Sequence, residues 1–315
     1  MSTFLAPPAT APAPSRRPSR LKIWLQAVRV FSFTASVVPI LVASALAVLD
    51  RAFDPLLAAT MLLASVACHA GANLANDYHD HLKGIDAADA LGPSRVIQER
   101  LLSPAEVRRG MIVPFALATL LGLAIVAATG WPILALALGS LAAAYFYTGG
   151  PKPLGYVALG EVTVFLSMGV GMVLGASYVF TGTLTLAALL ASLPIACLVA
   201  AILHANNIRD LATDRAAGKV TLATRLGRPA ANREYALLLA GAYLATLALV
   251  IAEPRLWPAL LSLLTLPTAT ALVRRLQIAS SPQDLNAILR RTAGLHLRFG
   301  FLLTAGLIVA AILGR

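Results

Sequence analysis

The sequence predicts an all-α protein, a polytopic membrane bundle of about nine transmembrane helices. Of its 315 residues, 58% are hydrophobic and only 12% are charged, against ~25% charged residues in a soluble domain. The apolar residues gather in blocks of about 20, the length that a helix needs to cross the ~30 Å hydrocarbon core of a bilayer. Because too few polar groups remain to cover a water-facing surface, we predict one membrane domain over 21–315.

Nine apolar segments give the expected spans in order: 30–49, 55–75, 111–129, 131–147, 156–178, 184–203, 236–252, 256–273 and 294–313. Only Glu161 and Arg298 place a charge inside a span. An ionisable side chain at membrane depth is costly and marks a functional candidate, although one near a helix end can reach the interface. The sequence leaves the roles of Glu161, His296 and Arg298 open.

The first 20 residues, rich in Pro, Ala and Ser, predict a disordered cytosolic tail. A cleaved signal peptide is not expected, because basic residues begin only at Arg16 and the first apolar block is too long. The two cysteines, Cys68 and Cys197, lie inside apolar runs and are expected to be buried thiols rather than a disulfide or metal pair.

Basic residues fall on one side of the predicted topology. The tail and the connections after the even-numbered spans hold 21 of the 25 Lys and Arg residues. The positive-inside rule then predicts a multi-pass protein of the inner, or cytoplasmic, membrane with its N-terminus and its long loops in the cytosol. This asymmetry also accounts for the net charge of +11, so we expect the lipid bilayer, and no nucleic acid, as a partner.

The second span ends in a run of amides and acids: Asn73, Asn76, Asp77 and Asp80, followed by Lys83 and Asp86. On a helix, Asn73, Asp77 and Asp80 share one face. The sixth span ends in a similar run: Asn206, Arg209, Asp210 and Asp214, followed by Lys219. Both runs close an even-numbered span, so together they predict an internal repeat of the kind found in membrane bundles.

Carboxylates stacked on one helix face repel each other unless a cation lies between them. Oxygen-only ligands suit Mg²⁺, which takes a few carboxylates and completes its shell with phosphate oxygens and water. Two such faces across a cavity therefore predict metal ions that bridge a diphosphate. The alternative is a pair of solvated helix ends whose acids are matched by Lys83, Arg209 and Arg215; two runs in matching positions favour the metal.

A third element follows the fourth span, where Gly149, Gly150 and Pro151 make a tight turn between Tyr147 and Lys152. Backbone amides in such a turn can face an anion, and Lys152 supplies a point charge for phosphate. The histidines do not have the spacing of a zinc site with two His ligands.

Taken together, these segments resemble the UbiA superfamily of membrane prenyltransferases. Within it they are most similar to the menaquinone branch, the 1,4-dihydroxy-2-naphthoate polyprenyltransferases. The segments that carry the resemblance are 76–86, 92–95, 147–156 and 206–223. The superfamily's third acid of the first motif is Gly84 here, with Asp86 two residues later, which is the pattern of the menaquinone branch and argues against a 4-hydroxybenzoate enzyme.

The resemblance implies that 21–315 is a single transmembrane prenyltransferase domain that binds Mg²⁺, a polyprenyl diphosphate and an aromatic acceptor. The implied metal ligands are Asp77, Asp80, Asp210, Asp214 and Asp86. Lys152 and Tyr147 complete the implied catalytic set, Tyr147 with Tyr78 sheltering an allyl cation. The implied substrate-binding residues are Asn73, Asn76, Asn206, Arg209, Lys219, Arg29 and Lys83.

The expected reaction is prenylation of 1,4-dihydroxy-2-naphthoate with loss of its carboxylate, as in menaquinone biosynthesis. Two alternatives stay open from the sequence. One is a prenyltransferase for another acceptor, such as homogentisate. The other is a cation-coupled transporter or a lipid-binding membrane protein, which acids at membrane depth would favour; here the acids cluster at helix ends.

Overall fold

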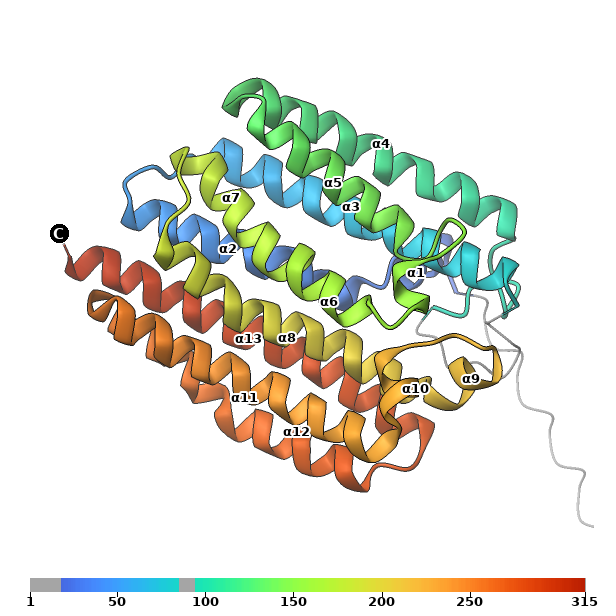
Figure 1. The fold of residues 1–315 in the computed structure, drawn as a ribbon. Helices are drawn as coiled ribbons and strands as arrows, with labels where there is room; N and C mark the ends of the chain where they lie inside the picture. Colours follow the sequence, from blue (N-terminus) through green and yellow to red (C-terminus); the bar gives the residue numbers. More distant parts are fainter. Residues whose placement is uncertain (1–17, 85–93, 315) are drawn as a thin grey trace, which may run out of the picture.

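The computed structural model describes residues 18–84 and 94–314, and Figure 1 shows them as a bundle of helices. The elements of the first half are α1 (Arg20–Ala27), η1 (Val30–Phe33), α2 (Thr34–Leu49), α3 (Pro55–Leu82), α4 (Pro104–Thr129), α5 (Pro132–Phe146) and η2 (Leu154–Tyr156). Those of the second half are α6 (Gly160–Val164), the π-helix η3 (Phe165–Gly171), α7 (Met172–Thr181), α8 (Leu186–Arg209), α9 (Leu211–Ala216), α10 (Leu222–Leu226), α11 (Arg228–Ala252), η4 (Pro254–Thr265), α12 (Leu266–Ile278) and α13 (Pro282–Leu313).

The predicted membrane bundle is confirmed. Among the described residues, eight helices are long and apolar enough to cross a membrane: Val30–Leu49, Pro55–Leu82, Pro104–Thr129, Gly160–Thr181, Leu186–Arg209, Arg228–Ala252, Pro254–Ile278 and Pro282–Leu313. The ninth predicted span is α5, which has only 15 residues and rises about 22 Å, less than the ~30 Å hydrocarbon core. Each of the nine predicted segments therefore corresponds to a helix, one of them short.

Several helices extend past the last apolar residue. α3 runs to Leu82 and α8 to Arg209, whereas the predicted spans ended at 75 and 203. α13 begins at Pro282, where the hydroxyl of Ser281 accepts a hydrogen bond from the backbone N–H of Asp284 at 3.1 Å. Because the backbone hydrogen-bond ladder continues through polar residues, the acidic runs lie on helices and project from them at fixed angles.

The bundle is centred on α8 and edged by α4. Two-thirds (67%) of the apolar stretch of α8 is buried inside the bundle, against 11% for α4. In Figure 1, α3, α4 and α5 lie on one side of the molecule, and α11 and α12 lie on the other. Close packing on α8 depends on small residues: a Cβ placed on Gly169 of η3 would lie 2.2 Å from Ala196 Cα.

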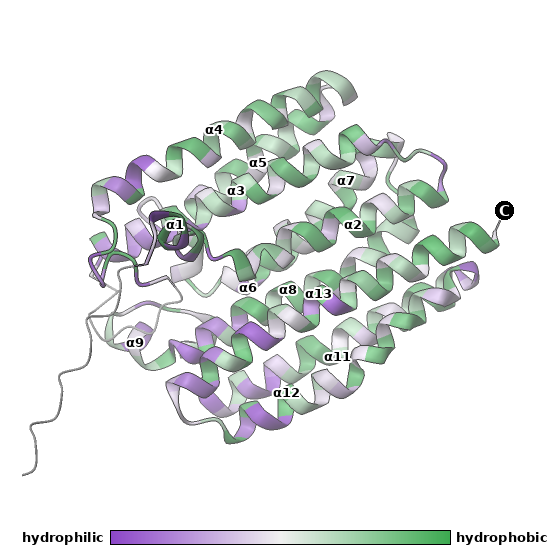
Figure 2. Cartoon of the chain, turned by 180° about the vertical axis from the view of Figure 1, so that it is seen from behind, coloured by the Kyte–Doolittle hydropathy of each residue, from purple (hydrophilic) through white to green (hydrophobic). Residues whose placement is uncertain are grey.

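Polar residues collect at one end of the bundle, which we call the polar end. It is formed by α1, η2, α9 and α10, and Figure 2 shows hydrophilic residues concentrated there while the long helices are hydrophobic. The C-terminus lies at the opposite end. Most of the predicted tail, residues 1–17, lies outside the described residues, and Arg20 is the first residue of α1.

Candidate functional site

A cavity of about 430 Å³ extends from the polar end into the membrane part of the bundle. At depth it is lined by apolar side chains of α2, α3, α4, α5 and α7, among them Ile40, Met61, Ile125, Ile133 and Val179. At the polar end it is lined by ten of the side chains singled out from the sequence: Arg29, Asn73, Asn76, Asp80, Tyr147, Asn206, Arg209, Asp210, Asp214 and Lys219. The cavity thus joins a charged mouth to a long apolar interior.

The two acidic runs present matching Asn–Asp pairs to this mouth. Asn76 Nδ2 donates to Asp80 Oδ2 at 3.3 Å on α3, and Asn206 Nδ2 donates to Asp210 Oδ2 at 3.2 Å at the end of α8. Each pair spans one helical turn. The two runs therefore share this local geometry, with Asn76 and Asp80 in the positions that Asn206 and Asp210 take in the other run.

Asp77 is placed differently from the metal ligand expected from the sequence. Its carboxylate is buried and accepts hydrogen bonds from the guanidinium of Arg29 and the hydroxyl of Ser94, and it does not line the cavity. Arg29 also donates to Asn76 Oδ1 at 3.1 Å. One residue along a helix turns a side chain by about 100°, so Asp77 points beside the cavity while Asn76 and Asp80 point into it. Asp77 anchors the segment before η1 and the loop around residue 94 to α3.

Asp210 is held by its neighbour Arg209, whose side chain is completely buried. Arg209 Nε donates to Asp210 Oδ1 at 2.7 Å, and its Nη2 donates to Asp210 Oδ2 at 2.5 Å and to Asn206 Oδ1 at 3.0 Å. Its remaining nitrogen, Nη1, donates to Asn286 Oδ1 of α13 at 3.0 Å. The bidentate pair fixes the carboxylate orientation and offsets its charge at the mouth of the cavity.

Two loops from distant parts of the sequence meet at the mouth. Val157 and Val220 form an isolated parallel bridge, and Ala158 N–H donates to Val220 O at 2.8 Å. This bridge sets Tyr156 beside Lys219, whose ammonium group lies 5.1 Å from the centre of the tyrosine ring. The bridge therefore ties the segment after α5 to the segment after α9.

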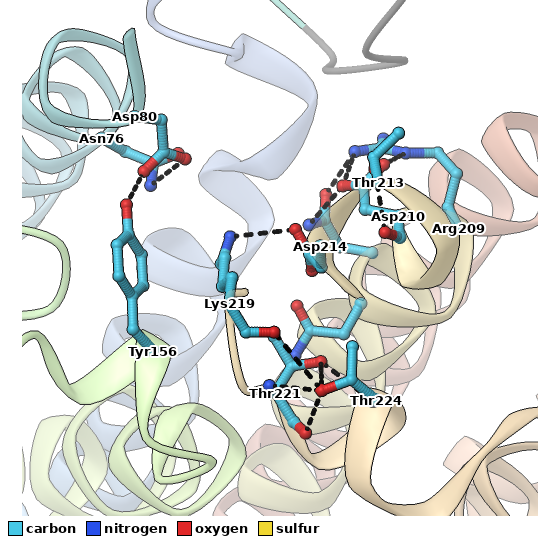
Figure 3. Close-up of polar contacts among 12 residues, drawn as sticks. Asn76, Asp80, Tyr156, Arg209, Asp210, Thr213, Asp214, Lys219, Thr221 and Thr224 are labelled. Atoms are coloured by element: carbon cyan, nitrogen blue, oxygen red, sulfur yellow. Dashed lines mark hydrogen bonds and ion pairs between the residues drawn. The ribbon is translucent and has the colours of Figure 1, made fainter. Parts of the chain in front are cut away.

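A polar chain then crosses from one acidic helix to the other. The Tyr156 hydroxyl donates to Asp80, and Lys219 Nζ lies 3.5 Å from Asp214 Oδ1 (Figure 3). Lys83, at the end of α3, also stands over the Tyr156 ring at 4.3 Å and donates to Thr148 O at 3.0 Å. Neither Tyr156 nor Ser94 received a role from the sequence, although they lie in the segments 147–156 and 92–95 that carry the resemblance.

The carboxylate and the ammonium at this mouth have shifted pKa values. Burial raises the pKa of Asp214 from its usual 3.8 to about 6; Lys219 opposes this shift, while Asp210 and Asp80 add to it. Burial lowers the pKa of Lys219, but the carboxylates of Asp80, Asp214 and Asp210 outweigh it and leave the pKa above its usual value. The mouth therefore holds a firmly charged cation next to a carboxyl whose pKa lies closer to neutrality than usual.

The remaining predicted site residues lie elsewhere. Lys152 is exposed to solvent and does not line the cavity. Tyr147 lines the cavity, as expected from the sequence. Tyr78 packs against the cluster of Ile23 and its neighbours, away from the cavity, so the sheltering position expected for it is not observed. Asp86 lies outside the described residues.

The mouth suits a divalent cation that is shared with a substrate. Within residues 18–84 and 94–314, no three His, Cys, Asp or Glu side chains converge on a single point. The carboxylates instead lie on two walls, and Asp214 Oδ2 is buried without a hydrogen-bond partner in the protein. This arrangement does not form an all-protein cage. It does fit Mg²⁺, which usually takes one or two carboxylates and shares the substrate's phosphate oxygens.

The polar residues inside the spans have separate partners. Glu161 is buried in α6, where it accepts from Asn207 Nδ2 at 2.9 Å and pairs with His204 Nδ1 at 3.0 Å. His296 is buried in α13 with its Nδ1 3.3 Å from Thr34 Oγ1, and Arg298 is exposed on the same helix. Glu161, His296 and Arg298 do not line the cavity.

Comparison with known families decides what this architecture is. The model of the UbiA prenyltransferase family matches residues 36–312, nearly the whole described bundle. The chain belongs to the UbiA prenyltransferase family. The family and the enzyme class expected from the sequence are thereby confirmed: this UbiA-family protein is a membrane prenyltransferase, and the observed helices are its catalytic scaffold.

Individual relatives place this UbiA-family chain near the menaquinone branch. It is 33% identical over 301 residues to the 1,4-dihydroxy-2-naphthoate octaprenyltransferase of Bacillus subtilis, covering 95% of this chain and 96% of that one. It is 36% identical over 282 residues to the Escherichia coli enzyme of the same name, covering 87% and 91%. The fold is shared with a UbiA homolog from Archaeoglobus fulgidus, determined bound to GPP and Mg²⁺: TM-score 0.65, 17% identity, coverage 90% and 99%.

Proposed function

We propose that this prenyltransferase moves a polyprenyl group from its diphosphate to 1,4-dihydroxy-2-naphthoate, with Mg²⁺ at the diphosphate and with loss of CO₂ from the acceptor. The observation that carries the proposal is a mouth where Asp80 lies across from Asp210 and Asp214, opening into an apolar cavity. A polyprenyl diphosphate has this shape and polarity. The names of the relatives supply the acceptor, and the Archaeoglobus structure supplies the precedent of a prenyl diphosphate with Mg²⁺.

Asp80, Asp210 and Asp214 would hold the metal, with Asn76 and Asn206 orienting two of these carboxylates. Bound there, Mg²⁺ would neutralise the negative charge that grows on the leaving diphosphate. Asp77 takes the supporting position described above, and Asp86 keeps its place as a proposed ligand outside the described residues.

The chain's own cations would bind the diphosphate from the protein side. At the mouth, Lys219 is paired with Asp214 and Arg209 with Asp210. Their positive charges are therefore in place before the substrate arrives. Lys83 is near the Tyr156 ring at the rim of this site. Because Lys152 is exposed and does not line the cavity, we place it at the entrance to the site and not among the groups that bind the diphosphate. The face of Tyr147 would shelter the allyl cation by cation–π attraction.

The proposed reaction balances without a base at the ring carbon. The C–O bond of the donor breaks, and its electron pair leaves with diphosphate. The carboxyl-bearing ring carbon forms a bond to the allyl carbon, and the C–CO₂ bond then breaks, returning its electron pair to the ring. Arg29 and Arg209 are the cations that would recognise the acceptor carboxylate, both beside the mouth.

The orientation follows from charge. We propose that the polar end faces the cytosol at the cytoplasmic membrane, because 21 of 25 Lys and Arg residues fall on that side. Both diphosphate and acceptor would then enter from the cytosol, while the polyprenyl tail stays in the apolar cavity. Family membership decides against the transporter or lipid-binding alternative; homogentisate remains the alternative acceptor.

The test uses purified full-length protein, a polyprenyl diphosphate and 1,4-dihydroxy-2-naphthoate labelled in its carboxylate. We expect prenylated product, released pyrophosphate and labelled CO₂ in equal amounts with Mg²⁺, and none of these with a chelator. Homogentisate and 4-hydroxybenzoate serve as competing acceptors. Product without labelled CO₂, or product only from a competing acceptor, would overturn the acceptor; turnover in the presence of the chelator would overturn the metal.

A further inference from the structure

One wall of the cavity is polar at a depth where most of the lining is apolar. It consists of Ser32 of η1, Ser36 of α2 and His69 of α3, all of which line the cavity, and we call it the serine–histidine wall. On α3, His69 precedes Asn76 by about two turns, so the wall lies about 10 Å further into the bundle than the acidic mouth.

Hydrogen bonds to both ring nitrogens hold the imidazole of His69 in position. His69 Nε2 lies 3.2 Å from Ser32 Oγ, and Nδ1 lies 2.9 Å from Ser36 Oγ. Ser32 Oγ donates its hydrogen to Arg29 O at 2.8 Å and accepts from Asn73 Nδ2 at 3.2 Å. Because that hydrogen is in use, Ser32 accepts from an Nε2–H of His69, while Ser36 Oγ lies within reach of both His69 Nδ1 and Ser65 O, the latter at 3.4 Å. The wall is therefore a pre-oriented set of hydroxyl and imidazole groups.

The polyprenyl tail does not require this wall. A hydrocarbon chain forms no hydrogen bonds, and polar groups covered by it lose water without compensation. A purely structural link between helices does not need to face the cavity either. The pair of His296 and Thr34 shows this: it joins α13 to the start of α2 at 3.3 Å, and neither side chain lines the cavity. The serine–histidine wall combines helix linkage with access to the cavity.

We propose that the serine–histidine wall binds the ring hydroxyls of the aromatic acceptor. This inference rests on the proposed prenyl transfer and specifies its acceptor site. The Ser36 oxygen keeps a lone pair that can accept a hydrogen bond from a phenolic hydroxyl. Asn73 lies between His69 and Asn76 and also lines the cavity, so acceptor and diphosphate would be adjacent along α3. The wall thereby selects a hydroxylated ring over a plain one.

The experiment compares Ser36→Ala and His69→Gln with wild type in purified full-length protein. Both KM values are measured separately, for the aromatic acceptor and for the polyprenyl diphosphate. Each substitution should raise the acceptor KM roughly three- to tenfold, the value of one hydrogen bond, and leave the donor KM at its wild-type value. Thr34→Val is the matched control, because it removes a hydroxyl that bonds a histidine outside the cavity, and both of its KM values should match wild type.

A second arm changes the ligand rather than the protein. An acceptor with one ring hydroxyl methylated should have a higher KM than the unmodified acceptor with wild type. Ser36→Ala should raise the KM of the methylated acceptor little further, because the same contact is already lost. An unchanged acceptor KM in both variants, or equal shifts in both KM values, would reduce the wall to a helix link and overturn the inference. If wild type releases no pyrophosphate from the donor at all, the proposed function fails, and this inference fails with it.

Discussion

At the scale of single residues, neighbouring acids of one motif have different tasks. Asp80 points into the cavity, where it accepts from Asn76 and Tyr156, whereas Asp77 is buried against Arg29 and Ser94. The two positions lie about 60° apart around the helix, and the contacts with Arg29 and Ser94 hold Asp77 beside the cavity. We expect the fold to tolerate an amide in place of the Asp80 carboxylate, which faces the mouth. An amide in place of Asp77 should destabilise the fold, because the Asp77 carboxylate neutralises the nearly buried guanidinium of Arg29.

Substitution of these two acids should separate their tasks. Asp80→Asn should abolish pyrophosphate release while its thermal unfolding stays near wild type, because only a ligand of the diphosphate site is lost. Asp77→Asn should instead lower stability by about 3 kcal/mol, since it removes the counter-ion of Arg29, yet the folded fraction should still be stabilised by Mg²⁺. Pyrophosphate release measures the loss of activity, and thermal unfolding with and without Mg²⁺ measures stability and metal binding. An active Asp80→Asn enzyme together with an Asp77→Asn protein insensitive to Mg²⁺ would reverse the assignment.

Asp214 should make the metal-free protein sensitive to pH. Its pKa in the folded protein is about 6 against the usual 3.8, so the folded state binds the proton more tightly than the unfolded state. Its contribution to stability is present below pH 3.8 and is lost as pH rises through about 6, a change of at most about 3 kcal/mol. With a chelator present at pH 7, Asp214→Asn should therefore unfold at a higher temperature than wild type. The difference between the two unfolding temperatures should be smaller at pH 4.5. An equal difference at both pH values would show that Asp214 has an ordinary pKa.

At the scale of elements, the site depends on helices that continue beyond their apolar parts and on close packing at α8. The Asn–Asp pairs recur at the ends of α3 and α8, and the bridge between Val157 and Val220 adds Lys219 and Tyr156 between them. η3 packs on α8 through Gly169, where a side chain would meet backbone. Positions of this kind hold the two acidic helices at a fixed separation.

Gly169→Ala should destabilise the protein by about 1–3 kcal/mol, because its Cβ would lie 2.2 Å from Ala196 Cα and the helices would have to move apart. Gly139→Ala in α5 is the control: its Cβ would meet no atom within 4 Å, and alanine favours a helix. Thermal unfolding should show a lower midpoint for the first variant and an equal or higher one for the second. Equal midpoints would indicate that η3 and α8 adjust without cost.

At the scale of the whole molecule, the fold separates a charged end from an apolar body. The cavity crosses this boundary, so one ligand can place its diphosphate at the polar end and its hydrocarbon chain within the bundle. In the proposed reaction, the apolar lining would keep water from an allyl cation formed at the mouth. The side of the membrane that the polar end faces then decides from which side the diphosphate can reach the site.

Reporter fusions test that direction. Fusions at residues 90, 220 and 283 should all report the cytosol, because they fall in the connections that hold most of the Lys and Arg residues. A fusion at the C-terminus should report the opposite side, since the last span begins at the polar end and finishes away from it. A signal from outside the cytosol at any of the three loop positions would overturn the proposed orientation.

The sequence by itself determined the class of fold, the order of the nine apolar segments and the family. These follow from local information: hydrophobic length, the sign of loop charge, and short motifs whose spacing is read along one chain. It also picked out most of the side chains at the mouth, because carboxylates repeated at the ends of two helices repel one another unless they share a cation.

Only the tertiary structure decided which of those residues face the cavity. Asp77 and Asp80 satisfy the same spacing rule, and their difference arises from Arg29 and Ser94, which reach α3 from distant segments. Tyr156 lies in the site because a bridge between two loops sets it beside Lys219, whereas the side chain of Lys152 is exposed to solvent and does not line the cavity. Spacing along a helix fixes relative angles, but the direction of a cavity is set by the helices that pack around it.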